Sequence, residues 1–305
     1  MNKLRFGAYV YEPEKAEGFD FHVLRVKQET GKRIMPMQDM YSNIAVFADN
    51  VAARNNKNWI SQSPLGPAQF GNYNYNIYWD VVCATQPEHR AEQLKYIEEV
   101  DRQSPGIWLN SQYFADHGHC TCPRCKKLWE KSGLTWLGWR RKEVTDYIEQ
   151  IREHVKKELV MCIQPDPITA YERYGVDFND LAKYADAFNV VMLSKSYATP
   201  WYWEMLARGF KKILKKPVYI SLYVSCPGDS PKDVPPPAEL LNTSVRCART
   251  GIDGILYFAA GAKQLLDFQK GAVDNFELRR RLRSYGGYPV QEVLDLVNNW
   301  EQLIQ

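Results

Sequence analysis

The sequence predicts an α/β protein that forms a single (β/α)8 TIM barrel, and three observations lead to this fold class. Short segments rich in β-branched and aromatic residues alternate with longer helical segments, about eight times along 305 residues. Strands that alternate with helices in this way form parallel sheets with right-handed crossovers. No GxGxxG follows the first strand segment and no GxxxxGK[ST] occurs, so open nucleotide-binding sheets lose their main support.

The strand segments are taken in chain order. They cover residues 4–11, 43–49, 77–85, 106–114, 158–164, 187–197, 217–225 and 251–260. Eight strand–helix units in one chain fit a closed barrel better than an open sheet. We therefore expect residues 1–305 to form one domain, with the proline-rich segment 226–239 as the loop after the seventh strand.

Helical periodicity marks the segments between the strands. In residues 88–103, Leu94, Ile97 and Val100 recur at helical spacing just after Pro87, which is typical of a helix start. Residues 137–157 carry a similar apolar stripe, and residues 288–304 have the pattern of a closing helix.

Composition excludes some classes of function. Charged residues make up 25% of the chain, the net charge is +3 and no long basic run occurs, which argues against a nucleic-acid surface. The sequence has no long apolar run and no charged-then-apolar leader, so we expect a soluble, cytoplasmic protein without membrane contact. The chain has 9 Trp, 19 Tyr and 12 Phe, and most are expected in the core. Tyr and Trp beyond the needs of a core often line clefts for carbohydrate or other flat ligands.

The cysteine spacing predicts a metal site. Three of the seven cysteines form a C-x-C-x-x-C motif, at Cys120, Cys122 and Cys125, which indicates reduced thiols around a metal and not a disulfide framework. A structural zinc takes four ligands in a tetrahedron. Cys83 is the expected fourth ligand, because it ends the predicted third strand, beside the fourth strand that carries the motif. His117 and His119 are the competing fourth ligands.

The same region resembles a known family. The segments VVCATQPEHR (81–90), NSQYF (110–114) and HCTCPRCKKLW (119–129) resemble family 42 β-galactosidases and related hypothetical glycosyl hydrolase-like barrels. In that family a cysteine after strand 3 joins a C-x-C-x-x-C after strand 4 to bind zinc. The resemblance covers roughly residues 77–140. It implies a barrel with a zinc-braced loop after strand 4 that acts on, or binds, carbohydrate.

The catalytic positions of the family are not matched. Its members carry Asn-Glu at the end of strand 4 and a Glu on strand 7. Here Ser111 and Gln112 replace the first pair, and residues 218–228 contain no carboxylate. An alternative alignment, to hypothetical glycosidases, places Asn110 where those proteins have Asp. Because an amide cannot donate and retake a proton as a carboxyl group does, the usual two-glutamate mechanism is not predicted.

Other side chains at predicted strand ends form the candidate site, since barrel enzymes build their sites at the carboxyl ends of strands. Asp166 and Asp116 are the candidate catalytic carboxylates, with Asp49 and Glu12 as further acids on the same face. The candidate substrate ligands are Asn110, Gln112, Lys195 and Tyr197, with Trp201 and Trp203 as a stacking wall.

Three functions remain open. The first is a glycoside hydrolase with a non-standard carboxylate pair, and the second is a carbohydrate-binding barrel without hydrolysis. The third is a metal-dependent hydrolase that uses Asp116, His117 and His119 around a zinc with an open position. The sequence leaves a homo-oligomer open.

Overall fold

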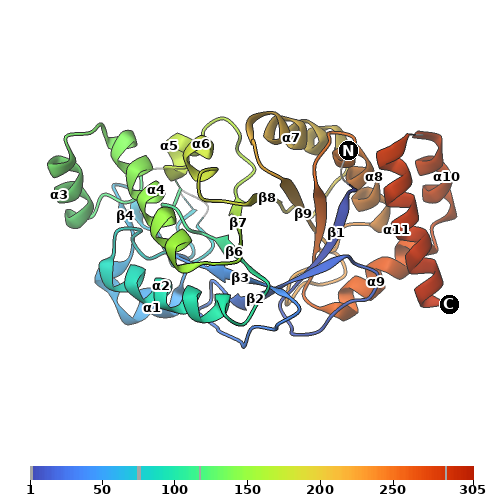
Figure 1. Ribbon diagram of the computed structural model, residues 1–305, viewed down its shortest axis with the longest axis horizontal. Helices are drawn as coiled ribbons and strands as arrows, with labels where there is room; N and C mark the ends of the chain where they lie inside the picture. The colour runs from blue at the N-terminus through green and yellow to red at the C-terminus, as the bar shows by residue number, and fades with distance from the viewer. Residues whose placement is uncertain (1–2, 74–76, 117, 286) are drawn as a thin grey trace. The chain divides into compact units, whose positions relative to one another are not determined.

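The computed structural model describes residues 3–73, 77–116, 118–285 and 287–305 (Figure 1). Its eight long strands are parallel, and their order is that of a closed barrel, β1-β10-β9-β8-β7-β6-β3-β2. These strands are β1 (Arg5–Val10), β2 (Phe21–Lys27), β3 (Tyr41–Ala45), β6 (Gly106–Asn110), β7 (Glu158–Ile163), β8 (Ala187–Met192), β9 (Val218–Tyr223) and β10 (Gly254–Phe258). The predicted closed barrel of eight parallel strands with helices is confirmed, and the zinc-braced loop after the fourth strand stays a prediction.

Two short strands and the helices complete the described structure. The strands β4 (Gln62–Ser63) and β5 (Gly66–Pro67) form a separate antiparallel pair. The helices are α1 (Asn50–Asn55), the 3-10 turn η1 (Lys57–Trp59), α2 (Pro87–Asp101), α3 (Pro123–Ser132), α4 (Trp136–His154), α5 (Ala170–Tyr174), α6 (Phe178–Leu181), α7 (Pro200–Ile213), α8 (Pro237–Ala248), α9 (Ala262–Val273), α10 (Phe276–Tyr285) and α11 (Tyr288–Ile304).

The chain forms two compact units, Arg25–Asp186 on the one hand and Met1–Leu24 with Ala187–Gln305 on the other. We call them the central unit and the terminal unit. The organisation as a single domain stays a prediction.

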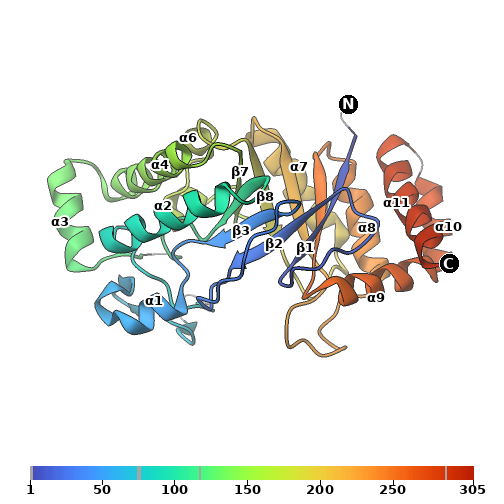
Figure 2. The ribbon, with the colours of Figure 1, turned by 60° about the horizontal axis from the view of Figure 1, so that its bottom comes forward.

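The central unit carries the sheet β3-β6-β7, whose two faces differ in character. Side chains alternate between the faces of a strand, and the register places Asn43, Asn110 and Cys162 on one face. The other face is apolar except for buried Ser42, and helix α2 packs on β3 and β6 and beside α4 (Figure 2). Helix α2 begins at Pro87, as the sequence predicts, and α4 follows the predicted apolar stripe.

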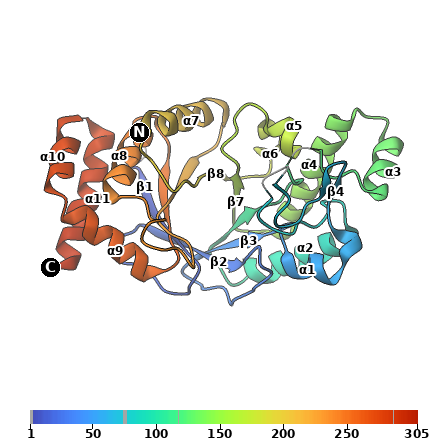
Figure 3. The same cartoon turned by 180° about the vertical axis from the view of Figure 1, so that it is seen from behind.

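The terminal unit carries the sheet β8-β9-β10-β1 with helices α7 to α11. Helix α11 covers the residues predicted to be helical at 288–304 and contacts both α8 and α9 (Figure 3). Trp300 of α11 is fully buried, and its ring packs on those of Tyr257 and Phe268 at centroid distances of 6.0 and 5.6 Å.

One predicted strand is wrong and one strand was missed. Residues 77–85 form no barrel strand; Val81 and Val82 make isolated antiparallel bridges in the long segment between β3 and α2. The eighth strand is β2, in which Arg25 and Lys27 interrupt the apolar pattern. Both side chains are buried because each meets an acidic partner. The other seven predicted strands are confirmed; each ends earlier than predicted, and β3 begins two residues before its predicted start.

In the ranges described here, no helix combines the length and the apolar character needed to cross a bilayer.

Candidate functional site

Four buried cysteines lie together in the central unit. The Sγ atoms of Cys83, Cys120, Cys122 and Cys125 are all within 4.8 Å of one another. The Cys83 sulfur is 3.9 Å from that of Cys122 and 3.4 Å from that of Cys125. Tetrahedral zinc with Zn–S bonds of about 2.3 Å places its sulfurs about 3.8 Å apart. The group therefore fits one zinc ion, and its spacing is too wide for a disulfide bond of about 2.05 Å.

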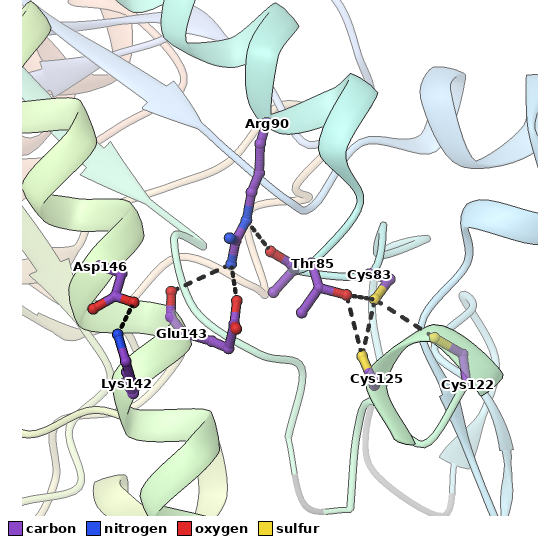
Figure 4. A network of polar contacts seen from close by, with 9 residues as sticks. Cys83, Thr85, Arg90, Cys122, Cys125, Lys142, Glu143 and Asp146 are labelled. Carbon is purple, nitrogen blue, oxygen red and sulfur yellow. Dashed lines mark hydrogen bonds and ion pairs between the residues drawn. The ribbon is translucent and has the colours of Figure 1, made fainter. Parts of the chain in front are cut away.

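Neighbouring groups orient the sulfurs. The Thr85 hydroxyl lies 3.3 Å from the sulfurs of both Cys83 and Cys125 (Figure 4), and the Gln62 backbone nitrogen donates to the Cys120 sulfur at 3.2 Å. Such contacts around a metal site hold its ligands in place. Hydrogen bonds among the four thiols lower the pKa of Cys122 and raise the pKa of Cys125, so the group shares its protons. Metal binding requires the thiolate forms and would release these protons.

A salt bridge braces the segment that carries Cys83. Arg90 of α2 donates through Nε to the Ala84 carbonyl at 2.5 Å. Its guanidinium also lies 3.1 Å from the Glu143 carboxylate of α4 (Figure 4). The residue after Cys83 is thus tied to two helices.

The predicted ligand set is brought together, although the reason given for Cys83 is partly wrong. Cys83 is not on a strand; it lies in the segment that follows β3, the third barrel strand. His119 is not part of the four-sulfur group, and its Nδ1 hydrogen-bonds to the Asp116 carbonyl at 2.6 Å. His117 lies outside the described residues. The identity of the metal as zinc stays a prediction.

The two candidate catalytic carboxylates lie together and share one guanidinium. Arg173 donates through Nε to Asp116 Oδ1 at 2.8 Å and through Nη2 to Asp116 Oδ2, and its Nη1 lies 3.2 Å from Asp166 Oδ2. These contacts raise the pKa of Arg173, with Asp116 as the main cause. The guanidinium therefore stays charged between two carboxylates.

Asp166 is held as an ionised acceptor. It accepts hydrogen bonds from the backbone nitrogens of Ile168 at 3.0 Å and Thr169 at 2.7 Å, and from the Thr169 hydroxyl. Partial burial favours the neutral carboxyl group, but these bonds and Arg173 outweigh it and lower the pKa of Asp166. A carboxyl group with a lowered pKa does not hold the proton that a general acid must donate.

The end of β6 presents two amides on a strained backbone. Asn110 donates through Nδ2 to Glu29 Oε1 at 2.7 Å. Ser111 follows with a φ of 54°, which is rare for a residue with a side chain and marks a functional position more often than chance. Gln112 is completely buried and donates to the Cys162 carbonyl at 3.0 Å, while its Oε1 has no hydrogen-bond partner in the described structure.

The predicted ligands of the terminal unit differ in accessibility. Lys195 is 57% exposed, and its Nζ lies 2.7 Å from Asp233 and 3.5 Å from Asp229. Tyr197 is buried, donates to the Met192 carbonyl at 2.8 Å and accepts from the Tyr223 backbone nitrogen at 2.6 Å. Its hydroxyl therefore joins the ends of β8 and β9.

Aromatic side chains cluster at the start of α7. Trp201 is 61% exposed, and its ring meets that of Tyr202 edge-on at 6.2 Å. Trp203 instead packs on Tyr197, with ring centroids 5.2 Å apart. Trp201 offers an exposed apolar face for stacking, whereas the Trp203 ring is packed against Tyr197.

The other two candidate acids have different surroundings. Asp49 caps α1 by accepting from the Ala52 backbone nitrogen at 2.9 Å, and it pairs with buried Lys27 at 2.8 Å. Glu12 is exposed.

Two carboxylates at strand ends were missed by sequence reasoning. Asp229 follows β9 by a few residues, and the chain turns back at Gly228 with a φ of 90°. The Cys226 backbone nitrogen donates to the Asp229 carboxylate at 2.6 Å. The Tyr223 hydroxyl also donates to this carboxylate. Glu29 follows β2, the strand that was not predicted. The turn residues CPGD were a usable signal for Asp229.

No protein-family model and no curated protein matches this sequence. Among solved structures, an α-L-fucosidase isoenzyme 2 from Paenibacillus thiaminolyticus is similar with a TM-score of 0.60 at 12% identity. The match covers 99% of this chain and 49% of the fucosidase, so the chain spans about half the length of that enzyme. An α-galactosidase from Thermus thermophilus, in complex with p-nitrophenyl α-D-galactopyranoside, matches with a TM-score of 0.46 at 10% identity over 93% of this chain and 62% of its own.

The likeness to the fucosidase is one of fold. It agrees with the predicted barrel fold, while the relation to glycoside hydrolases and membership of family 42 stay predictions.

Proposed function

We propose that this chain is a carbohydrate-binding protein built on a glycoside hydrolase-like barrel. The likeness in fold to a fucosidase and the exposed indole of Trp201 support a sugar ligand. We favour binding over hydrolysis because Arg173 lies between Asp116 and Asp166 and bonds to both carboxylates.

The chemistry follows from that position. Standard glycoside hydrolysis needs one carboxyl group that keeps its proton near neutral pH and one that is ionised. Arg173 forms an ion pair with both Asp116 and Asp166, and the pKa of Asp166 is lowered, so this carboxyl group does not keep a proton near neutral pH. Gln112 stands where the resemblance implies an acid, and it cannot supply the proton. Ionised carboxylates and amides are nevertheless good acceptors for sugar hydroxyls.

Hydrolysis is the second candidate, and Asp229 favours it. This carboxylate follows β9, the seventh barrel strand, and the Tyr223 hydroxyl and a backbone nitrogen hold it there. A metal-dependent hydrolase has less support, because a zinc with four thiolate ligands has no open position for water.

Binding and turnover should be measured on p-nitrophenyl α- and β-glycosides of D-galactose, D-glucose and L-fucose. We expect calorimetric binding of at least one sugar without release of p-nitrophenol above the uncatalysed rate. The proposal is wrong if a glycoside is cleaved and Asp166→Asn lowers kcat by at least about 100-fold, which is the usual scale of acid–base catalysis.

Trp201→Ala should weaken sugar binding about tenfold, because stacking on an exposed aromatic ring contributes on the order of 1–2 kcal/mol. The melting temperature should change little, since the indole is largely exposed. Phe276→Ala is the matched control, as this side chain is also exposed, at the start of α10. Equal affinities for the two variants would exclude Trp201 as the stacking residue.

A further inference from the structure

A buried carboxylate in the central unit has no part in the site proposed above. Glu29 follows β2, and its side chain is 7% exposed. Its Oε1 accepts from Asn110 Nδ2 at 2.7 Å and from the Arg25 guanidinium, whose side chain is 5% exposed. Arg25 and Asn110 belong to two barrel strands, β2 and β6, so the carboxylate is positioned from two sides.

The sheet face that carries Asn110, a hydrogen-bond donor to Glu29, also holds a buried acceptor without a partner. Asn43 lies on the same face of the sheet as Asn110 and is fully buried. It donates to the Cys162 sulfur at 3.6 Å, yet its Oδ1 has no hydrogen-bond partner within the described residues. A buried acceptor without a partner is destabilising, and a bound ligand is one of the ways by which proteins satisfy it.

The charges near Glu29 indicate the class of ligand. Arg25 already pairs with Glu29, and the polar side chains Asn43, Asn110 and Cys162 on the adjoining sheet face are uncharged amides and a thiol. A ligand carboxylate or phosphate bound here would be repelled by the Glu29 carboxylate. The Arg25 guanidinium would not offset this repulsion, because it already pairs with Glu29. Hydroxyl groups fit better, because each donates to an acceptor without adding charge.

We propose that Glu29, positioned by Arg25 and Asn110, binds hydroxyl groups of an uncharged sugar. The two contacts of the carboxylate converge on Oε1, which leaves Oε2 to accept from the ligand. This inference rests on the proposed function and names a further ligand-binding residue and the charge class of the sugar. The competing interpretation is an ion pair that only holds the loop after β2.

Methyl β-D-galactopyranoside and methyl β-D-glucopyranoside should be compared with the corresponding uronides by calorimetry. We expect the neutral glycoside that binds to do so at least tenfold more tightly than its uronide. Glu29→Gln should weaken neutral binding about 10- to 100-fold, the range for a hydrogen bond to a charged group. Asp101→Asn is the matched control, because it also removes a buried carboxylate of the central unit, one that accepts from the Lys156 backbone nitrogen, and it should leave the affinity within twofold.

Several outcomes would overturn the inference. If the Glu29→Gln variant binds the sugar as tightly as the wild type but has a lower melting temperature, Glu29 serves only as a structural ion pair. If the wild type binds a uronide as tightly as the neutral glycoside, the preference for a neutral ligand is excluded. If the Glu29→Gln variant does not fold, the Asn110→Ala variant is tested in its place. This variant loses one contact that positions Glu29 and should bind the sugar about three- to tenfold more weakly. Unchanged binding would count against the site. A wild-type protein that binds no glycoside overturns the proposed function itself.

Discussion

Replacing Cys122 by Ser should lower the free energy of unfolding by at least about 4 kcal/mol when zinc is present. The four sulfurs come from two segments far apart in the chain, so a bound ion joins them only in the folded state. A ligand present at about 1,000 times its Kd stabilises the folded state by about 4 kcal/mol, and zinc–thiolate sites often exceed that. Urea unfolding measures the loss, and elemental analysis should find one zinc per chain in the wild type.

Controls separate metal binding from simple packing. A chelator should destabilise the wild type to the level of Cys122→Ser and leave the variant unchanged. Cys247→Ala also removes a buried thiol, in α8 and outside the four-sulfur group, and its effect should not respond to the chelator. Any sugar affinity that the folded variant retains should change far less than its stability. Wild-type protein purified without chelator and free of zinc would contradict this prediction.

The metal group and the carboxylate pair belong to one continuous region of the central unit. Arg140 is almost completely buried and donates to the carbonyls of Glu172 at 2.6 Å and Arg173 at 2.7 Å. His119, next to Cys120, bonds to the Asp116 carbonyl. The loop that carries three of the sulfurs thus also positions one of the two carboxylates that Arg173 joins. A structural metal here would support the site indirectly.

The barrel was predictable because most of its strands follow the usual pattern of short apolar runs between amphipathic helices. The failure at β2 has a physical cause. Arg25 and Lys27 would normally mark a surface, and their acidic partners Glu29 and Asp49 lie outside the strand. Residues 77–85 have the composition of a strand, but Asp80 there accepts from the Phe70 backbone nitrogen and pairs with Arg54. Such compensation depends on tertiary contacts that composition does not reveal.

The candidate site was predictable to a similar degree. Cysteine spacing identifies a soft-metal site because three ligands lie within six residues, whereas Cys83 required a guess about neighbouring strands. Asp116 and Asp166 were chosen one at a time as acids at strand ends. Arg173, which joins them and changes their chemistry, is on α5 and carries no signal of that role in the sequence.

Lys27→Met should destabilise the fold by about 3–5 kcal/mol. Lys27 is completely buried, with Nζ 2.8 Å from Asp49 Oδ2 and 2.6 Å from the Ala45 carbonyl. Burial lowers the pKa of Lys27, and the Asp49 charge offsets part of that effect. The single variant leaves the buried Asp49 carboxylate without a counter-charge, which is the costly way to break such a pair. Lys142→Met, which breaks an exposed pair with Asp146 (Figure 4), should change stability little.

The double variant with Asp49→Asn should recover most of the loss, because Asn still caps α1 and no charge is left buried. The pH dependence supplies a second check. In the wild type, burial raises the pKa of Asp49, but Lys27 and the Ala52 amide lower it more, so its contribution is present above the unfolded pKa of about 3.9 and is lost as pH falls through the folded value. In Lys27→Met the folded pKa should rise above the unfolded one, so stability should increase as the pH falls from 7 toward 4. Denaturation curves over that range that stay parallel for the two proteins would show that Asp49 does not depend on Lys27.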